Sequence, residues 1–134
     1  MAKWLNDNIF DNGLNYIETT LIGGGKTITM HVIKAYTSGD SYATVTGNSV
    51  ANYTMGAGDF VVEAYTTGRK LTVSAKSGSN ATGNSGAGPD LHIALVNTTD
   101  NAVLAVTDET SNQVIVSGNP VSIPAWAIKF LQPT

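Results

Sequence analysis

The chain contains no cysteine, and only 13% of its 134 residues are charged. Without cysteine there is no disulfide, no thiolate metal ligand and no cysteine nucleophile. A typical domain has about 25% charged residues, so much of this surface must be covered by Ser, Thr, Asn and Gly or hidden by a partner. A chain of this length can bury about 70% of its unfolded surface, and we expect a single domain that folds without covalent crosslinks.

Clustered basic residues are also missing. The net charge is −3, and of the seven lysines and arginines only Arg69 and Lys70 are adjacent. Binding to nucleic-acid phosphates needs grouped cations that displace counterions. The sequence therefore argues against a nucleic-acid partner.

Long apolar runs are absent as well. No run approaches the roughly 20 apolar residues of a membrane span. The N-terminus turns polar directly after Leu5, whereas a signal peptide needs an apolar stretch of about 7 to 15 residues. We therefore expect no membrane partner and assembly in the cytoplasm.

Short apolar segments punctuated by Asn, Asp, Gly or Pro occupy most of the chain. Residues 91–96 and 102–106 flank one polar turn, and residues 60–65 and 71–75 flank another, which contains Gly68. Both pairs have the length and punctuation of β-hairpins. They are the strongest local indication of an all-β fold.

Two prolines bound a further short segment. Pro120 and Pro124 enclose residues 121–123. Because proline has no backbone N–H to donate to a ladder, we expect this segment to be an edge strand or to pair on one side only.

Alternation with a period of two predicts additional half-buried strands at residues 27–33 and 42–46. Between the strands, Gly47, Gly56 and Gly58 mark turns, and residues 48–59 are expected to form a surface loop. Residues 77–89 contain no large side chain, which predicts a flexible surface loop or a hinge between hairpins.

The segment 1–20 carries the only helical pattern. Its apolar residues recur at spacings that place them along one stripe of a helix over residues 4–20. Asn6 or Asp7 can cap its start, and Gly13 weakens it or breaks it. Such a helix could cover an edge or face of the sheet, or it could form an arm that grips a neighbouring subunit. Together with residues 21–134, this gives a single antiparallel β-sandwich or barrel-like domain with a short N-terminal helix.

A glycine-rich stretch imitates a phosphate-binding loop. Gly23, Gly24 and Gly25 precede Lys26, but the motif requires a glycine at position 20, which is Thr20. The following residues are typical of a strand, where the motif needs a helix. We expect these glycines to form the exit from the N-terminal helix.

No catalytic or metal-binding group can be assembled from the sequence. Ser41 and Ser85 lie in glycine turns, but a hydrolase also needs a base placed on the serine, and only His31 and His92 are available. Two histidines far apart in the chain, without an acidic triplet, make a zinc site improbable. The sequence predicts no enzyme, no cofactor and no metal.

Several other polar and aromatic residues have structural explanations. Most of the acidic residues fall in predicted turns, where aspartate bonds its own backbone; they are Asp40, Asp59, Asp90, Asp100 and the adjacent Asp108 and Glu109. Trp126 alternates with small residues, so we expect its indole to pack on one face of the sheet and its N–H to donate a hydrogen bond to a carbonyl. A sugar-binding platform is the weaker interpretation of this tryptophan.

Three segments resemble a family of small tailed-bacteriophage virion proteins that are encoded near the capsid genes. They are Trp-Leu-Asn-Asp at residues 4–7 with Gly-Leu-Asn-Tyr-Ile at 13–17, Gly-Arg-Lys-Leu-Thr-Val at 68–73, and His-Ile-Ala-Leu-Val at 92–96 with Val-Ser-Ile-Pro-Ala-Trp at 121–126. Their order and spacing extend over most of the chain, while residues 21–59 depart from the pattern.

The resemblance implies a capsid decoration, or cement, protein that sits as a homotrimer on the outer surface of the virion, bound to the major capsid protein. A cement protein needs a stable sheet and a complementary underside rather than a catalytic group. The candidate subunit or capsid contacts are Trp4, Leu5, Ile9, Phe10, Leu14 and Ile17. The alternative is a tail or fibre adhesin that binds host glycan through loop aromatics such as Tyr36, Tyr42 or Tyr53.

Overall fold

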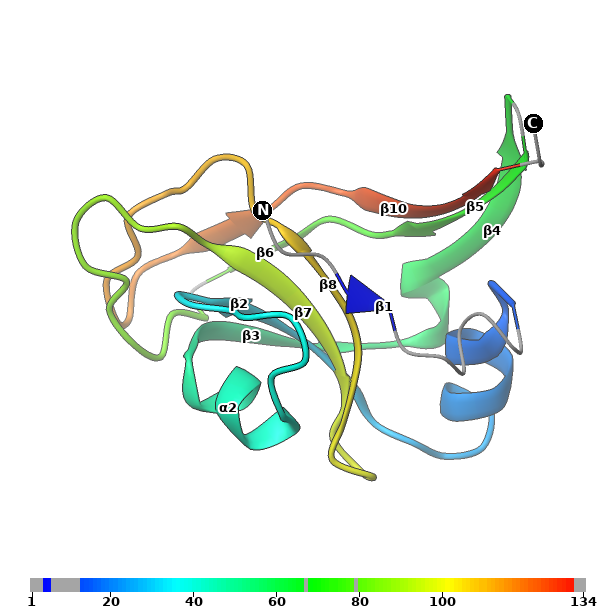
Figure 1. Cartoon of the computed structure of the whole chain (residues 1–134), viewed down its shortest axis with the longest axis horizontal. Coiled ribbons are helices and arrows are strands. Elements are labelled where there is room, and N and C mark those ends of the chain that lie inside the picture. Colours follow the sequence, from blue (N-terminus) through cyan, green and yellow to red (C-terminus); the bar gives the residue numbers. More distant parts are fainter. Residues whose placement is uncertain (1–3, 6–12, 67, 79, 132–134) are drawn as a thin grey trace.

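A computed structural model describes residues 4–5, 13–66, 68–78 and 80–131. The protein is mostly β, with antiparallel sheets and few short helices (Figure 1), as the sequence predicts, and the sheets stay open rather than closing on themselves. In chain order the elements are β1 (Trp4–Leu5), a π-helix η1 (Tyr16–Ile22), β2 (Ile28–Ile33), α2 (Tyr42–Gly47), β3 (Ser49–Met55), a 3-10 turn η2 (Ala57–Asp59), β4 (Phe60–Tyr65), β5 (Gly68–Val73), β6 (Lys76–Gly78), β7 (His92–Asn97), β8 (Ala102–Asp108), β9 (Val121–Ile123) and β10 (Trp126–Leu131).

The main sheet has the order β1-β8-β7-β2-β3, and all its neighbours are antiparallel. The predicted β7/β8 hairpin is confirmed, with Ala94 opposite Val106. At the centre, Met30 of β2 lies between Leu95 of β7 and Tyr53 of β3. All six residues of β2 are buried, so the prediction of a half-buried strand is wrong, because both faces of this sheet are covered.

Each face of the main sheet contributes to a separate apolar core. The larger core joins one face to the other two sheets and to η1, and it contains Met30, Leu95, Phe60, Leu71 and Ile123 among others. The smaller core lies on the opposite face under α2. It contains Ile33, Val45, Ala94, Val96, Val103 and Val106, with Tyr36 and Tyr42 packed at its margin.

A second sheet of three strands, β10-β5-β4, extends away from the main body, and the end of β10 lies near its tip (Figure 1). The predicted hairpin of β4 and β5 is confirmed, with Tyr65 opposite Gly68 at the turn. Register places Phe60, Val73 and Trp126 in one row across the three strands. That row belongs to or packs on the larger core. The opposite face of the sheet looks outward, and Val61 on it is 49% exposed.

The third sheet contains only β6 and β9 in the described part of the chain, with Ser77 opposite Ser122. The prediction that residues 121–123 pair on one side is therefore confirmed. The segment after β6, expected to be flexible, is fastened to its neighbours in this structure. Asn80 Nδ2 donates to the carbonyl of Asn52 at 2.9 Å, and the backbone N–H of Thr82 donates to Val50 at 2.8 Å.

The N-terminal segment departs from the predicted continuous helix over residues 4–20. Trp4 and Leu5 form β1 and pair with Val106 and Ala105 of β8. Residues 6–12, with the candidate contacts Ile9 and Phe10, lie outside the described residues. Gly13 has a φ of +72°, which is left-handed and interrupts a right-handed helix, and the helical turn η1 begins only at Tyr16.

Two further predictions are wrong in the segment between β2 and β4. Residues 42–46 form the helix α2 rather than a strand, because Ser41 caps its start: the Ser41 Oγ accepts from the backbone N–H of Thr44 at 3.2 Å. The helix then places Val45 in the smaller core with no exposed surface. Residues 48–59, expected to be a loop, contain β3, which pairs with β2 along its length.

Candidate functional site

The predicted serine and histidine residues do not form a catalytic group in this fold. Ser41 caps α2, and the Ser85 Oγ accepts from the backbone N–H of Ile115 at 2.9 Å. Each hydroxyl is therefore used locally, in a turn or cap. Neither serine is hydrogen-bonded to His31 or His92.

His31 instead forms a pair with Ser49, a partner that the sequence alone does not predict. Its Nδ1 lies 2.8 Å from Ser49 Oγ, and the same hydroxyl donates to the carbonyl of Ala51 at 3.1 Å. Because a hydroxyl has one hydrogen, His31 Nδ1 must be the donor. This is the reverse of a catalytic pair, in which serine gives its proton to histidine. Burial lowers the pKa of His31 and favours the neutral ring.

The glycine-rich stretch after η1 is a helix exit, as expected. The backbone N–H of Gly23 donates to Glu18 at 3.0 Å, and Gly25 has a φ of +84°. A Cβ at Gly23 would lie 2.3 Å from the carbonyl oxygen of Thr19, so the close turn explains this glycine. Lys26 is engaged at the surface, with its Nζ 2.9 Å from Asp100.

The six candidate contact residues are used in different ways. Leu14 and Ile17 are 8% and 0% exposed and belong to the larger core, so their side chains stabilise the subunit and offer little surface to another chain. Trp4 and Leu5 contribute backbone pairing to β8. Ile9 and Phe10 lie outside the described residues.

The tyrosines suggested for glycan binding are not free loop aromatics. Tyr53 is 6% exposed, and its hydroxyl donates to the carbonyl of Val121 at 2.7 Å. Burial raises its pKa. Tyr36 and Tyr42 are half-buried against the smaller core.

A shallow hollow of about 350 Å³ is formed by residues of the three-stranded sheet. Its lining residues are Tyr65, Lys70, Thr72, Ala125, Trp126, Ala127 and Lys129. The Nζ of Lys129 sits 4.5 Å from the centre of the Tyr65 ring, so a cation already occupies one face of that aromatic. Lys70 pairs with Glu63 at 3.5 Å, and the Thr72 hydroxyl and Lys70 lower the pKa of Glu63.

Trp126 itself differs from its predicted role in one respect. Its indole packs on the larger core as expected, but its Nε1 is buried without a hydrogen-bond partner in the described part of the chain. The prediction that this N–H finds a carbonyl is therefore wrong. Buried indole nitrogens usually have a partner.

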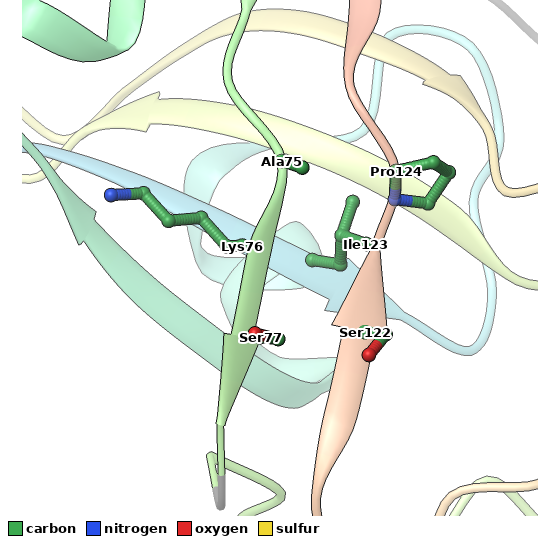
Figure 2. A pocket seen from close by; sticks show the side chains of 6 residues that line it. All are labelled: Ala75, Lys76, Ser77, Ser122, Ile123 and Pro124. Carbon is green, nitrogen blue, oxygen red and sulfur yellow. The ribbon is translucent and has the colours of Figure 1, made fainter.

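A second hollow, of about 330 Å³, lies beside β6 and β9. Figure 2 shows the two strands side by side, with Ser77 near Ser122 and the Lys76 side chain extending away from β9. The Lys76 Nζ is paired with Asp59 at 2.8 Å, so it is already neutralised. The remaining lining residues, Ala75, Ile123 and Pro124, are apolar. Nothing in this hollow provides the convergent polar groups of a specific ligand site.

One group of possible metal ligands was not foreseen from the sequence. Asp90, His92 and Asp108 each offer one ligand atom, and these atoms all lie within 4.8 Å of one another. His92 and Asp108 are opposite each other in the β7/β8 pair. The signal that could have found them is the hairpin register, which aligns the first residue of one strand with the last of the other.

Comparisons with protein-family models, with curated proteins and with solved structures find no match to this chain. None of the helices in the described part of the chain is long and apolar enough to cross a membrane.

Proposed function

We propose that this chain is a bacteriophage virion structural protein, a capsid decoration (cement) protein that binds the outer capsid surface and stabilises the head. The observation that carries the proposal is the three-stranded sheet β10-β5-β4. In the described part of the chain no further strand pairs with the outer side of β4. Unpaired edges are a ready template for pairing with another chain, and β addition is a common mode of protein recognition.

The groups available at the β4 edge follow from the hairpin register. The backbone N–H of Ser74 donates to Asp59 at 2.9 Å, immediately before the paired residues Phe60 and Val73. Hydrogen-bonded and non-bonded pairs alternate in an antiparallel ladder. Val61, Glu63 and Tyr65 therefore direct their backbone groups toward β5, whereas Val62 and Ala64 direct theirs toward the free edge.

The composition is compatible with such a role. A low charged fraction of 13% suits a docking surface whose affinity depends little on salt. We propose that copies of the chain associate as a homotrimer in which the β4 edge is covered, and that the assembly contacts the major capsid protein. The role requires no cofactor and no catalytic residue, and it involves neither nucleic acid nor a membrane.

The alternative, a tail or fibre adhesin for host glycan, has less support. Tyr53, Tyr36 and Tyr42 are buried or half-buried, and the ring of Tyr65 is covered on one face by Lys129. A glycan would have to displace this cation to stack on the ring.

Immunogold labelling of purified virions with an antibody to this chain is the experiment that tests the location. Label distributed over the capsid faces is expected from a decoration protein. Label confined to the tail would reject the decoration proposal and favour the adhesin, and unlabelled virions would reject both.

A pair of variants at one position tests whether the β4 edge mediates assembly. Ala64→Pro removes the outward N–H without touching the ladder to β5, and proline is tolerated on the open side of an edge strand. Ala64→Ser keeps the N–H and is the matched control. We expect Ala64→Pro to reduce trimer formation and capsid occupancy, measured by light scattering and by binding to capsids that lack the protein. Equal assembly of both variants, with unchanged melting, would contradict a role for this edge.

A further inference from the structure

The end of the β7/β8 pair brings together two carboxylates and an imidazole. His92 is the first residue of β7, and it lies opposite Asp108, the last residue of β8. Asp90 lies two residues before His92, in the segment that leads into β7. One ligand atom from each of the three residues lies within 4.8 Å of the other two.

The histidine provides an independent indication of a ligand. His92 is 4% exposed, and its Nδ1 is buried without a hydrogen-bond partner among the described residues. Its ring is held against Tyr36, with the ring centres 5.9 Å apart. A buried polar atom left unpaired destabilises the fold, and most buried polar atoms have a partner. A neutral imidazole can also be satisfied by giving its lone pair to a metal ion.

Among the described residues, no lysine or arginine forms an ion pair with this group. In the described residues the ion pairs join Lys26 with Asp100, Lys70 with Glu63, and Lys76 with Asp59. Asp90 and Asp108 take part in none of them. Asp108 is half-buried and Asp90 is exposed, so the group is closed on the His92 side and open on the Asp90 side, where an ion can enter.

We propose that Asp90, His92 and Asp108 bind a divalent transition-metal ion of the Zn²⁺ type. One imidazole nitrogen with two carboxylate oxygens suits zinc better than Ca²⁺ or Mg²⁺, which prefer all-oxygen surroundings. Zinc takes His nitrogen and carboxylate oxygen at about 2.0 to 2.2 Å. Three protein ligands leave one tetrahedral position for water or for a side chain of a neighbouring chain. The ligand atoms must move closer together, and the exposed Asp90 is the residue best able to move.

The bound ion would join three parts of the chain. It would fasten the end of the segment that precedes β7 to the first residue of β7 and the last residue of β8. An ion that binds the folded chain and not the unfolded chain raises stability in proportion to the logarithm of its concentration over Kd. The site is independent of the proposed decoration role, and its test does not require capsids.

Isothermal titration of ZnCl₂ into the full chain, at neutral pH in a buffer that does not bind zinc, measures the site directly. We expect saturable binding of one ion per chain. Asp90→Asn and Asp108→Asn should each weaken it by at least about tenfold, the lower end of what is lost when even an outer partner of a metal ligand is removed. Glu63→Gln and His31→Gln are the matched controls, a remote carboxylate and the second histidine, and should bind as the parent does.

Long-range ¹H–¹⁵N NMR of the histidine rings identifies the nitrogen involved. Zinc is expected to shift one ring nitrogen of His92 and to leave His31 unchanged. His92→Phe keeps an aromatic ring beside Tyr36 and should abolish binding; if it fails to fold, the two aspartate variants still decide the question. Absence of saturable binding at millimolar zinc would overturn the site. So would binding that survives both aspartate variants or that is lost in His31→Gln.

Discussion

The hydroxyl of Tyr53 donates to the backbone carbonyl of Val121 across 2.7 Å and thereby ties β3 of the main sheet to β9 of the two-stranded sheet inside the larger core. Tyr53 is 6% exposed and Val121 is 1% exposed, so water cannot replace the bond.

Replacing Tyr53 with phenylalanine is therefore expected to destabilise the fold. The substitution leaves the carbonyl of Val121 buried without its donor, a loss of about 1 to 3 kcal/mol. The free energy of unfolding in urea measures it. Tyr65→Phe is the control, because its hydroxyl lies at the surface beside Lys129 and its loss should cost less than about 0.5 kcal/mol. Equal effects of the two substitutions would contradict the importance of the buried bond.

Acid stability is expected to depend on Asp59. Partial burial alone would raise its pKa, but hydrogen bonds from Lys76 and from the backbone of Gly56, with the Lys76 charge, lower the pKa below its ordinary value of 3.8. The folded state therefore holds this proton less tightly than the unfolded state does. The stabilisation is fully present above about pH 4 and is lost as pH falls through the lowered pKa.

A double-mutant cycle with Asp59→Asn and Lys76→Met isolates the free energy of interaction between the Asp59 carboxylate and the Lys76 ammonium. The coupling free energy is expected to be on the order of 0.5 to 1 kcal/mol at neutral pH, since the pair at 2.8 Å is partly exposed. It should weaken as pH falls below the ordinary carboxyl range and Asp59 becomes protonated. A coupling that stays constant from neutral pH to pH 2 would show that the pair contributes nothing through ionisation.

The N-cap of α2 can be tested by substitutions at Ser41. Ser41→Ala removes the side-chain acceptor for the backbone N–H of Thr44 and is expected to cost about 1 kcal/mol. Ser41→Asp supplies another acceptor and should restore most of that loss. Thermal unfolding of the three proteins measures the difference. If alanine and aspartate melt together with serine, the cap does not stabilise the helix.

Local sequence patterns predicted the two hairpins, whereas α2 and β3 could not be predicted from such patterns. The β7/β8 and β4/β5 turns are read from neighbouring residues, as is the single pairing of β9 between Pro120 and Pro124. The stretch from Tyr42 to Thr46 imitates a strand because its threonines and valine alternate, and only the cap at Ser41 indicates a helix. β3 was missed because the glycines near it suggest a loop, while its partner β2 precedes it across α2.

The group of Asp90, His92 and Asp108 could likewise not be predicted from local sequence patterns. Asp90 and Asp108 have ordinary turn-like surroundings in the sequence, and neither predicts a ligand by itself. Their meeting depends on the exact register of β7 with β8, in which His92 faces Asp108. A one-residue slip would direct one of these side chains to the other face of the sheet.

The N-terminal segment offers the last test, because Ile17 was predicted as a contact with another chain and is instead fully buried in the larger core. Ile17→Ala is expected to lower the free energy of unfolding of the isolated subunit by about 2 to 5 kcal/mol. Val61→Thr, at a position that is 49% exposed on the three-stranded sheet, is the control and should stay within about 0.5 kcal/mol. Urea unfolding at a concentration where the chain is monomeric separates the two roles. A buried core residue loses stability in the monomer, whereas a residue used only between subunits would lose it only in the assembled state.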